Sequence, residues 1–213
     1  MKTIIINTSP RKNWNTAKIL KAAQKGAESA GSQTEYIDLY DIQCTGCRSC
    51  LACKRTGLDN PCKCYWKDEL SPIIERIFAA DNLIIGSPIY FGETTSQFHA
   101  LMERLCFPAL SYNNYGSVFH GKVNVSIFLT MNAGRNFYED SYAPKFDEEF
   151  QTFGLLNGTV NIYPISNTLQ VDDYDKYEMK AMNSEDKHKS RSEQFPKDLD
   201  IAFNVGADMN KIQ

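Results

Sequence analysis

Cysteine gives the clearest chemical pattern in this sequence. The chain has 213 residues and seven cysteines, six of which fall within the segment 44–64. Their order is Cys44-x2-Cys47-x2-Cys50-x2-Cys53-x8-Cys62-x-Cys64. Repeated Cys-x2-Cys steps bring thiolates within reach of one soft centre, as in 4Fe-4S and zinc sites. Free, partly buried thiols or a redox-active disulfide are alternatives that this spacing leaves open.

The polar loop 8–16 is a second candidate site, and it follows the apolar segment 2–7. Its hydroxyl and amide side chains would lie beside the free N–H groups of a helix N-terminus, which suits a phosphate dianion. Arg11 can add a charge-assisted hydrogen bond. The alternative is a plain helix cap made by Asn15 or Thr16. Because the loop lacks both G-x-G-x-x-G and G-K-S/T, a tight ATP or NAD site is not expected there.

Two further loops follow apolar segments. The loop 86–94 combines glycines, a proline and adjacent aromatic residues. Such a rigid turn can present backbone N–H groups and a flat apolar wall to a planar ring, although its aromatic side chains can instead pack into the core. The loop 130–136 offers small and amide residues able to reach the polar edge of a ring.

The elements that must position these loops alternate between strand and helix. Continuous apolar runs predict buried strands, and apolar positions at helical spacing predict helices. The expected strands are 2–7, 34–39, 82–87, 122–130 and 158–165, and the expected helices are 17–30, a segment beginning near 68, 96–105, 142–153 and 198–209. This alternation predicts an α/β fold: a flavodoxin-like three-layer sandwich with a five-stranded parallel sheet and helices on both faces. Ligands of such sheets bind beyond the carboxyl ends of the strands, where we expect all these loops, the cysteine loop included.

Composition sets the broad class of protein. Hydrophobic residues make up 42% of the chain, and we expect a single domain over 1–213, with a polar excursion at 172–193 that lies in solvent. The net charge is -3 and the basic residues are scattered, so no nucleic-acid partner is expected. No apolar run is long enough to span a bilayer and no secretory signal is recognisable, so we expect a cytoplasmic protein without a membrane partner.

Several motifs together resemble one known family. The opening N-x-S-P-R-x-x-x-N-T at 7–16 and the turn G-S-P-I-Y-F-G at 86–92 look like those of the NAD(P)H-dependent FMN reductase and iron-sulfur flavoprotein group of the flavodoxin-like superfamily. The segment 46–53, with Cys64 four residues before Asp68, is similar to that group too. The resemblance covers about the first half of the chain. This chain differs in having Thr8 where family members carry glycine, and in a longer gap between Cys53 and Cys64.

The resemblance implies a bound FMN, and it implies which residues hold each group. The phosphate would be held by Ser9, Arg11, Asn15 and Thr16. The isoalloxazine would be held by Pro88, Ile89, Tyr90, Phe91, Gly92, Thr130, Met131 and Asn132. A 4Fe-4S cluster close to the flavin would be held by Cys47, Cys50, Cys53 and Cys64.

The implied function is that of an NAD(P)H-dependent flavin oxidoreductase. Hydride would pass from NAD(P)H to FMN, and electrons would then reach a small acceptor such as a quinone, a nitro or azo compound, or free flavin. The cofactor carries this chemistry, so no catalytic side chain is predicted. The alternative is an electron-transfer iron-sulfur flavoprotein that NAD(P)H does not reduce directly. The family also implies a homodimer or homotetramer.

Overall fold

One parallel sheet of five strands organises the computed structural model, which describes residues 1–59 and 62–211. The strands are β1 (Lys2–Asn7), β2 (Gln33–Asp38), β3 (Asn82–Pro88), β4 (Val123–Thr130) and β5 (Asn157–Ile165). Their spatial order is β2-β1-β3-β4-β5, with every neighbouring pair parallel. The strand order therefore reverses between β1 and β3, which is where ligands of such sheets usually bind.

Continuous apolar runs become strands because both faces of the sheet are covered. Ile4 and Ile6 pack into one core cluster, whereas Ile5 packs into the cluster on the opposite face. β4 is buried along its whole length, while the edge strands β2 and β5 are mostly half-buried or exposed. This is the burial pattern expected of a parallel sheet inside a sandwich.

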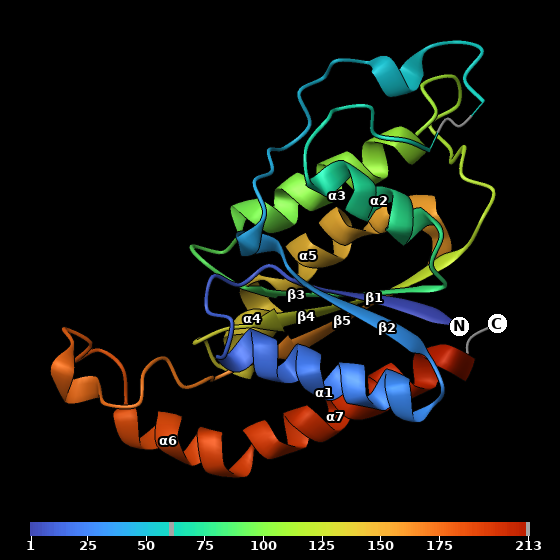
Figure 1. Ribbon diagram of the computed structural model, residues 1–213. Helices are drawn as coiled ribbons and strands as arrows, with labels where there is room; N and C mark the ends of the chain where they lie inside the picture. Colours follow the sequence, from blue (N-terminus) through green and yellow to red (C-terminus); the bar gives the residue numbers. More distant parts are fainter. Residues whose placement is uncertain (60–61, 212–213) are drawn as a thin grey trace.

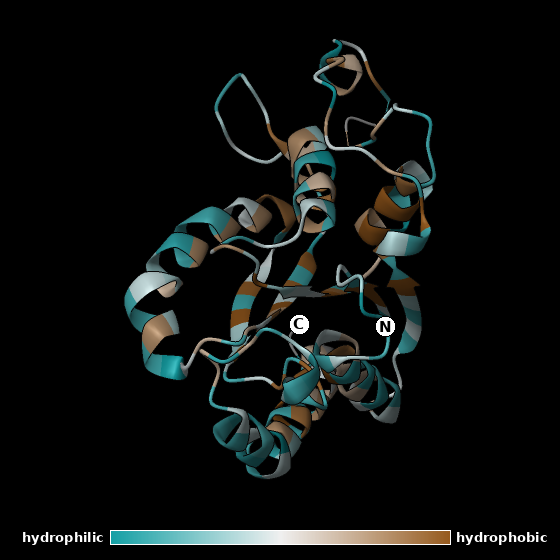
Figure 2. Cartoon of the chain, turned by 90° about the vertical axis from the view of Figure 1, so that its left-hand side faces the viewer, coloured by the Kyte–Doolittle hydropathy of each residue, from teal (hydrophilic) through white to brown (hydrophobic). Residues whose placement is uncertain are grey.

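Helices form a layer on each side of the sheet, as Figure 1 shows and the end-on view of Figure 2 makes plain. One layer holds α1 (Asn15–Ser29) and α7 (Phe195–Asp208), with α6 (Ser184–Glu193) leading into α7. The other holds α2 (Leu70–Phe78), α3 (Ser96–Ala109), α4 (Arg135–Ser141) and α5 (Ala143–Phe150). The short 3-10 turns are η1 (Leu39–Asp41), η2 (Ala52–Lys54), η3 (Gln151–Leu156), η4 (Tyr174–Lys176) and η5 (Met209–Lys211). The predicted three-layer α/β sandwich is confirmed.

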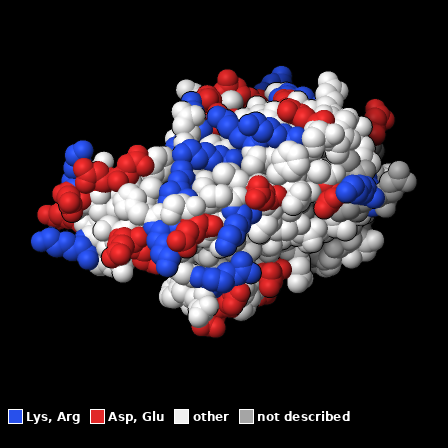
Figure 3. Space-filling model, turned by 90° about the horizontal axis from the view of Figure 1, so that it is seen from below, with Lys and Arg blue, Asp and Glu red and all other residues white. Residues whose placement is uncertain are grey.

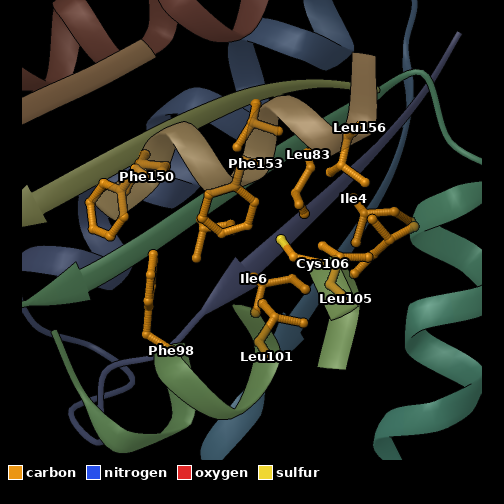
Figure 4. Packing of buried hydrophobic residues seen from close by; sticks show 14 of the residues in the cluster. Ile4, Ile6, Leu83, Phe98, Leu101, Leu105, Cys106, Phe150, Phe153 and Leu156 are labelled. Carbon is orange, nitrogen blue, oxygen red and sulfur yellow. The ribbon is translucent and has the colours of Figure 1, made fainter. Parts of the chain in front are cut away.

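Aromatic side chains fill the core between the sheet and the α3 layer. Phe98 lies with its ring centroid 5.1 Å from that of Phe150, and Phe153 packs against both rings (Figure 4). Cys106 is 3% exposed within the same cluster. Its position matches the core role expected for a cysteine alone in an apolar helix.

The helix predicted over 142–153, with Pro144 in its first turn, is present but ends earlier. The structure has α5 from Ala143 with Pro144 in its first turn, and the 3-10 turn η3 follows it. Proline fixes the first turn but lacks an N–H for a preceding turn, so a new helix starts there. α4 was not predicted, because only Tyr138 among its residues is buried and the segment has no apolar positions at helical spacing.

The outer face of the α1, α6 and α7 layer carries Lys, Arg, Asp and Glu side chains together (Figure 3). None of the helices in the described ranges 1–59 and 62–211 is long and apolar enough to cross a membrane.

Candidate functional site

The three predicted loops meet in one cavity of about 100 Å³ beyond the carboxyl ends of β1, β3 and β4. Ten of the twelve residues expected around FMN line it: Ser9, Arg11, Asn15, Thr16, Pro88, Ile89, Tyr90, Thr130, Met131 and Asn132. Trp14, Thr168 and Gln170 complete the lining, and sequence reasoning missed these three. Phe91 and Gly92 do not line it. The topology therefore brings the loops together as the order of the strands requires.

The first loop is fixed by buried hydrogen bonds. Asn7 accepts from the Ser9 N–H at 3.0 Å, and the hydroxyl of Ser9 accepts from the Arg11 N–H at 3.1 Å. Thr8 binds the Gly86 carbonyl through both its N–H and its hydroxyl, each at 2.9 Å. These contacts tie the loop to β3.

The N-terminus of α1 has no side-chain cap. Trp14 stands at the cap position, and no side-chain cap hydrogen bond forms there. Asn15 instead donates to the Leu169 carbonyl at 2.9 Å. The Thr16 hydroxyl lies 2.7 Å from that of Thr130, which joins the first loop to the third. The alternative of a plain cap by Asn15 or Thr16 is therefore not what the structure shows, and the helix end suits an anion.

Gly86 lets α1 approach β3 beside this cavity. A Cβ atom at Gly86 would lie 2.8 Å from the methyl group of Thr16 and 2.8 Å from Leu20. Such distances are too short for carbon atoms, so only glycine permits this packing. The glycine that opens the turn 86–92 is therefore required because it allows the start of α1 to pack against β3.

The second loop makes a tight turn after β3. Tyr90 and Glu93 exchange backbone hydrogen bonds of 2.8 and 3.0 Å, with Phe91 at φ 53° and Gly92 at φ 79° between them. Two consecutive positive φ values are typical of a type I′ turn, and they are costly for a bulky residue such as phenylalanine. The Phe91 side chain is fully exposed. Phe91 and Gly92 thus shape the turn, while Tyr90 faces the cavity and has its pKa raised by burial.

A C-terminal segment forms the remaining wall. Arg11 donates to the Gln170 carbonyl at 2.7 Å, and its guanidinium lies 4.3 Å from the Trp14 ring centroid. The Trp14 indole N–H donates to the Leu169 carbonyl at 3.0 Å. No signal in the local sequence pairs residue 11 with residue 170, because only the tertiary fold brings them together.

The expectation that 172–193 lies in solvent is wrong in part. Tyr174 and Lys187 are buried, and the Tyr174 hydroxyl accepts from the Gln170 N–H at 2.9 Å. Arg191 of α6 donates to Asn15 at 3.1 Å. The physical reason is that this polar segment folds back over the first loop. Its long side chains bury their apolar parts there and form hydrogen bonds with polar groups such as the Asn15 side chain.

The four cysteines chosen from the resemblance share a second, small cavity. Cys47, Cys50, Cys53 and Cys64 all line it. Burial raises the pKa of Cys53, the charge of Lys54 lowers it, and the neighbouring Cys64, Cys47 and Cys50 raise it by smaller amounts. Cys44 and Cys62 lie outside this lining.

Within residues 1–59 and 62–211, no three His, Cys, Asp or Glu residues are placed to hold a metal ion. Zinc requires four ligands within about 2.3 Å of one ion, and these thiols are not gathered that closely. A 4Fe-4S cluster binds one thiolate at each of four separate iron atoms, so its ligands surround a larger object. Four thiols on one loop around one cavity suit that donor set by chemistry.

Arg104 of α3 supports this loop, and sequence reasoning missed it. Its side chain is 1% exposed and forms an ion pair with Asp68. It donates to the Cys64 sulfur at 3.3 Å and to the Thr45 carbonyl at 3.2 Å. Burial favours a higher pKa for Asp68, but the hydrogen bonds and charge of Arg104 outweigh it and hold that pKa below its ordinary value.

The two cavities share no lining residue, and the expected closeness of cluster and flavin stays a prediction. The first cavity reaches Tyr90, ahead of α3, whereas the cysteine cavity lies against Arg104, Phe107 and Pro108. At 1.5 Å per residue, Ser96 and Arg104 are about 12 Å apart along the helix axis. After β2 the chain leaves the sheet edge and runs over the α3 layer (Figure 1).

The sheet order and the loops at its carboxyl edge define a flavodoxin-like protein. Residues 1–148 match the family model described as NADPH-dependent FMN reductase. The match spans more than half of the chain, so the chain belongs to that family.

Curated relatives carry iron-sulfur flavoprotein names. One from Methanocaldococcus jannaschii is 36% identical over 104 residues, covering 49% of this chain and 51% of the relative. Another, from Clostridioides difficile, is 32% identical over 139 residues, covering 60% of this chain and 59% of the relative. The chain thus spans between half and two thirds of the length of these relatives.

Solved structures share the fold at low sequence identity. An NAD(P)H:quinone oxidoreductase from Methanothermobacter marburgensis superposes with a TM-score of 0.72 at 15% identity, covering 99% of this chain and 97% of the other. An azoreductase from Bacillus anthracis gives 0.66 at 14% identity, covering 98% and 99%. At this identity the likeness concerns the fold.

Proposed function

We propose that this chain is an FMN-dependent oxidoreductase that takes electrons from NAD(P)H and passes them through bound FMN to a small acceptor. Quinones, nitro or azo compounds and free flavin are the acceptor classes. The observation that carries the proposal is the cavity at the sheet edge, where an uncapped helix N-terminus and an unpaired amide oxygen lie together. Membership of the family and the names of the structural neighbours support it.

Each wall of the cavity suits a different part of FMN. The N–H groups at the start of α1, with Ser9 and Thr16, suit the phosphate, and Arg11 adds a positive charge. Ile89 and Tyr90 offer a flat apolar wall for the ring. The side-chain oxygen of Asn132 is buried and has no hydrogen-bond partner among the residues that the structure describes, so it can accept from a ring N–H. When bound, FMN supplies the hydride and electron chemistry.

The test begins with the purified protein. Its absorption spectrum should show a bound flavin, and chromatography of a heat-released extract should identify FMN rather than FAD. Added NADH or NADPH should bleach the flavin under anaerobic conditions, and a quinone should restore the colour. Release of FAD, or a protein with no affinity for added FMN, would contradict the proposal. Sedimentation of the same sample tests the expected homodimer or homotetramer.

A second candidate function is that of an electron-transfer iron-sulfur flavoprotein. It is favoured by the four thiols around one cavity and by the names of the curated relatives. Iron and acid-labile sulfide measured after anaerobic reconstitution test it, with Cys50→Ser as the altered ligand and Cys106→Ser as a cysteine control in the core. If the wild type takes up no more iron than Cys50→Ser, the cluster is absent. Failure of NAD(P)H to bleach an iron-loaded flavoprotein would favour the carrier.

A further inference from the structure

Lys187 is buried although it belongs to a polar helix. Its exposure is 7%, while its neighbours Asp186 and His188 are exposed. Its ammonium group donates to the main-chain carbonyl of Asn132 and to the side-chain oxygen of Asn167. Asn132 lines the candidate FMN cavity, so this ammonium lies directly behind the cavity wall.

The positive charge of Lys187 is not neutralised at contact distance. In the part of the chain that the structure describes, both hydrogen-bond acceptors of its ammonium are neutral oxygens, and no carboxylate lies within 4.0 Å of it. Asp186 is the charge that acts on it, but its carboxylate accepts from the amide of Asn167 at 2.7 Å instead. Burial lowers the pKa of Lys187, and the charge of Asp186 opposes this effect. A buried charge without an anion in contact is costly, so an anion bound nearby would stabilise it.

The adjacent loop indicates which anion that is. Lys187 contacts Asn132 in the third loop, whose side-chain oxygen is buried and unpaired. The phosphate-suited residues lie on the first loop, where Arg11 already supplies a cation. A bound FMN that accepted a hydride from NAD(P)H would gain two electrons and one proton, NAD(P)+ would leave, and the reduced ring would carry one extra negative charge. The Asn132 loop lines the cavity proposed for FMN, so a cation held behind that loop would stabilise this charge.

We propose that Lys187 is a positioning and charge-supplying residue of the FMN site. It holds the Asn132 loop through its hydrogen bonds, and its charge favours reduced, anionic FMN over oxidised FMN. This inference rests on the proposed function, because it requires that FMN occupies the cavity.

The experiment compares four variants of the FMN-loaded full chain, the fourth being a second neutral variant at position 187. Lys187→Gln removes the charge but keeps a hydrogen-bonding side chain, and Lys187→Arg keeps the charge. Lys189→Gln is the matched control, because Lys189 is exposed two residues further along α6 and its loss changes the net charge equally. The measurements are the affinity for oxidised FMN, by fluorescence titration, and the midpoint potential of bound FMN, by equilibration with redox dyes.

In Lys187→Gln the ratio of affinities for reduced and oxidised FMN should fall about tenfold, which lowers a two-electron potential by about 30 mV. Lys187→Arg should retain a potential near that of the wild type, and Lys189→Gln should not move it. Thermal unfolding of each apoprotein reports whether the fold survives, and Lys187→Met serves as a second neutral variant.

Three outcomes would overturn the inference while the proposed function stands. If Lys187→Gln weakened the binding of oxidised and reduced FMN equally, the charge of Lys187 would act on the phosphate, or Lys187 would contribute only to packing. An equal shift in Lys189→Gln would make the effect one of general charge. If neither Lys187→Gln nor Lys187→Met folds, Lys187 is needed for stability, and the proposed effect of its charge on FMN is rejected. A wild type that binds no FMN at all would instead defeat the proposed function itself.

Discussion

The cavity at the sheet edge and the cysteine loop are held by different kinds of structure. Strand ends carry the loops of the first, and buried hydrogen bonds such as Thr16–Thr130 join them. The cysteine loop lies outside the sheet, and its main buried anchor is the Arg104–Asp68 pair. A site on strand ends follows from topology, whereas a site on a long loop depends on individual contacts with α3, such as those of Arg104 and Glu103 with the cysteine loop. The two regions should therefore respond differently to substitution.

Removal of Arg104 should have the largest effect and should act on the cysteine region. In Arg104→Met the half-buried Asp68 loses its ion-pair partner, and the Cys64 sulfur loses a hydrogen-bond donor. Breaking a buried pair in this way costs about 3–5 kcal/mol. Urea unfolding should show this loss, with Arg48→Met as the control, because Arg48 is exposed and lies 4.4 Å over the Trp66 ring. Equal stability of the two variants would mean that Arg104 does not anchor the loop.

Loss of Arg11 should have the next largest effect, and it should act on ligand binding. Arg11→Ala removes a cation from the cavity wall, and a hydrogen bond to a charged group is worth about 1.5–3 kcal/mol. FMN titration should show a correspondingly weaker Kd with little change in unfolding free energy. Lys12→Ala is the control, because Lys12 is exposed and pairs with Asp41 instead. An unchanged Kd in Arg11→Ala would place the phosphate elsewhere.

The difference between loops at strand ends and distant chain segments also explains which parts of the site could be predicted from the sequence. The loops 8–16, 86–94 and 130–136 each follow a strand with a clear apolar pattern, so their meeting could be predicted. The wall formed by Leu169 and Gln170 could not, because it depends on a polar segment folding back across about 160 residues of chain. The same limit applies to Lys187. Sequence polarity predicted solvent exposure for it, and only the folded chain shows its burial.

Gly86→Ala tests whether the packing of α1 against β3 maintains the cavity at the sheet edge. The added methyl group would press on Thr16 and Leu20, and overpacking of this kind costs about 1–3 kcal/mol. Because the strain falls at the start of α1, FMN affinity should fall together with stability. Gly134→Ala is a matched control, since its Cβ would have no heavy atom within 4 Å and its φ is not positive. If both variants behave alike, α1 can shift without disturbing the cavity.

The smallest effect concerns acid pH and the cysteine side. Arg104 holds the pKa of Asp68 below its ordinary value against the opposing effect of burial. For a carboxyl group whose pKa is lowered by folding, the contribution to stability is complete above the pKa of the unfolded chain, near 3.8, and disappears as the pH falls through the folded-state pKa. The wild type should therefore lose stability below about pH 4 more steeply than Asp68→Asn, which has no such proton to take up. Urea unfolding from pH 6 down to pH 2.5 measures this, with Asp200→Asn as a control at an exposed acid. Parallel curves for wild type and Asp68→Asn would show that the pair adds nothing that depends on ionisation, and the loop would then be held by the hydrogen bonds of Arg104 to Thr45 and Ser71.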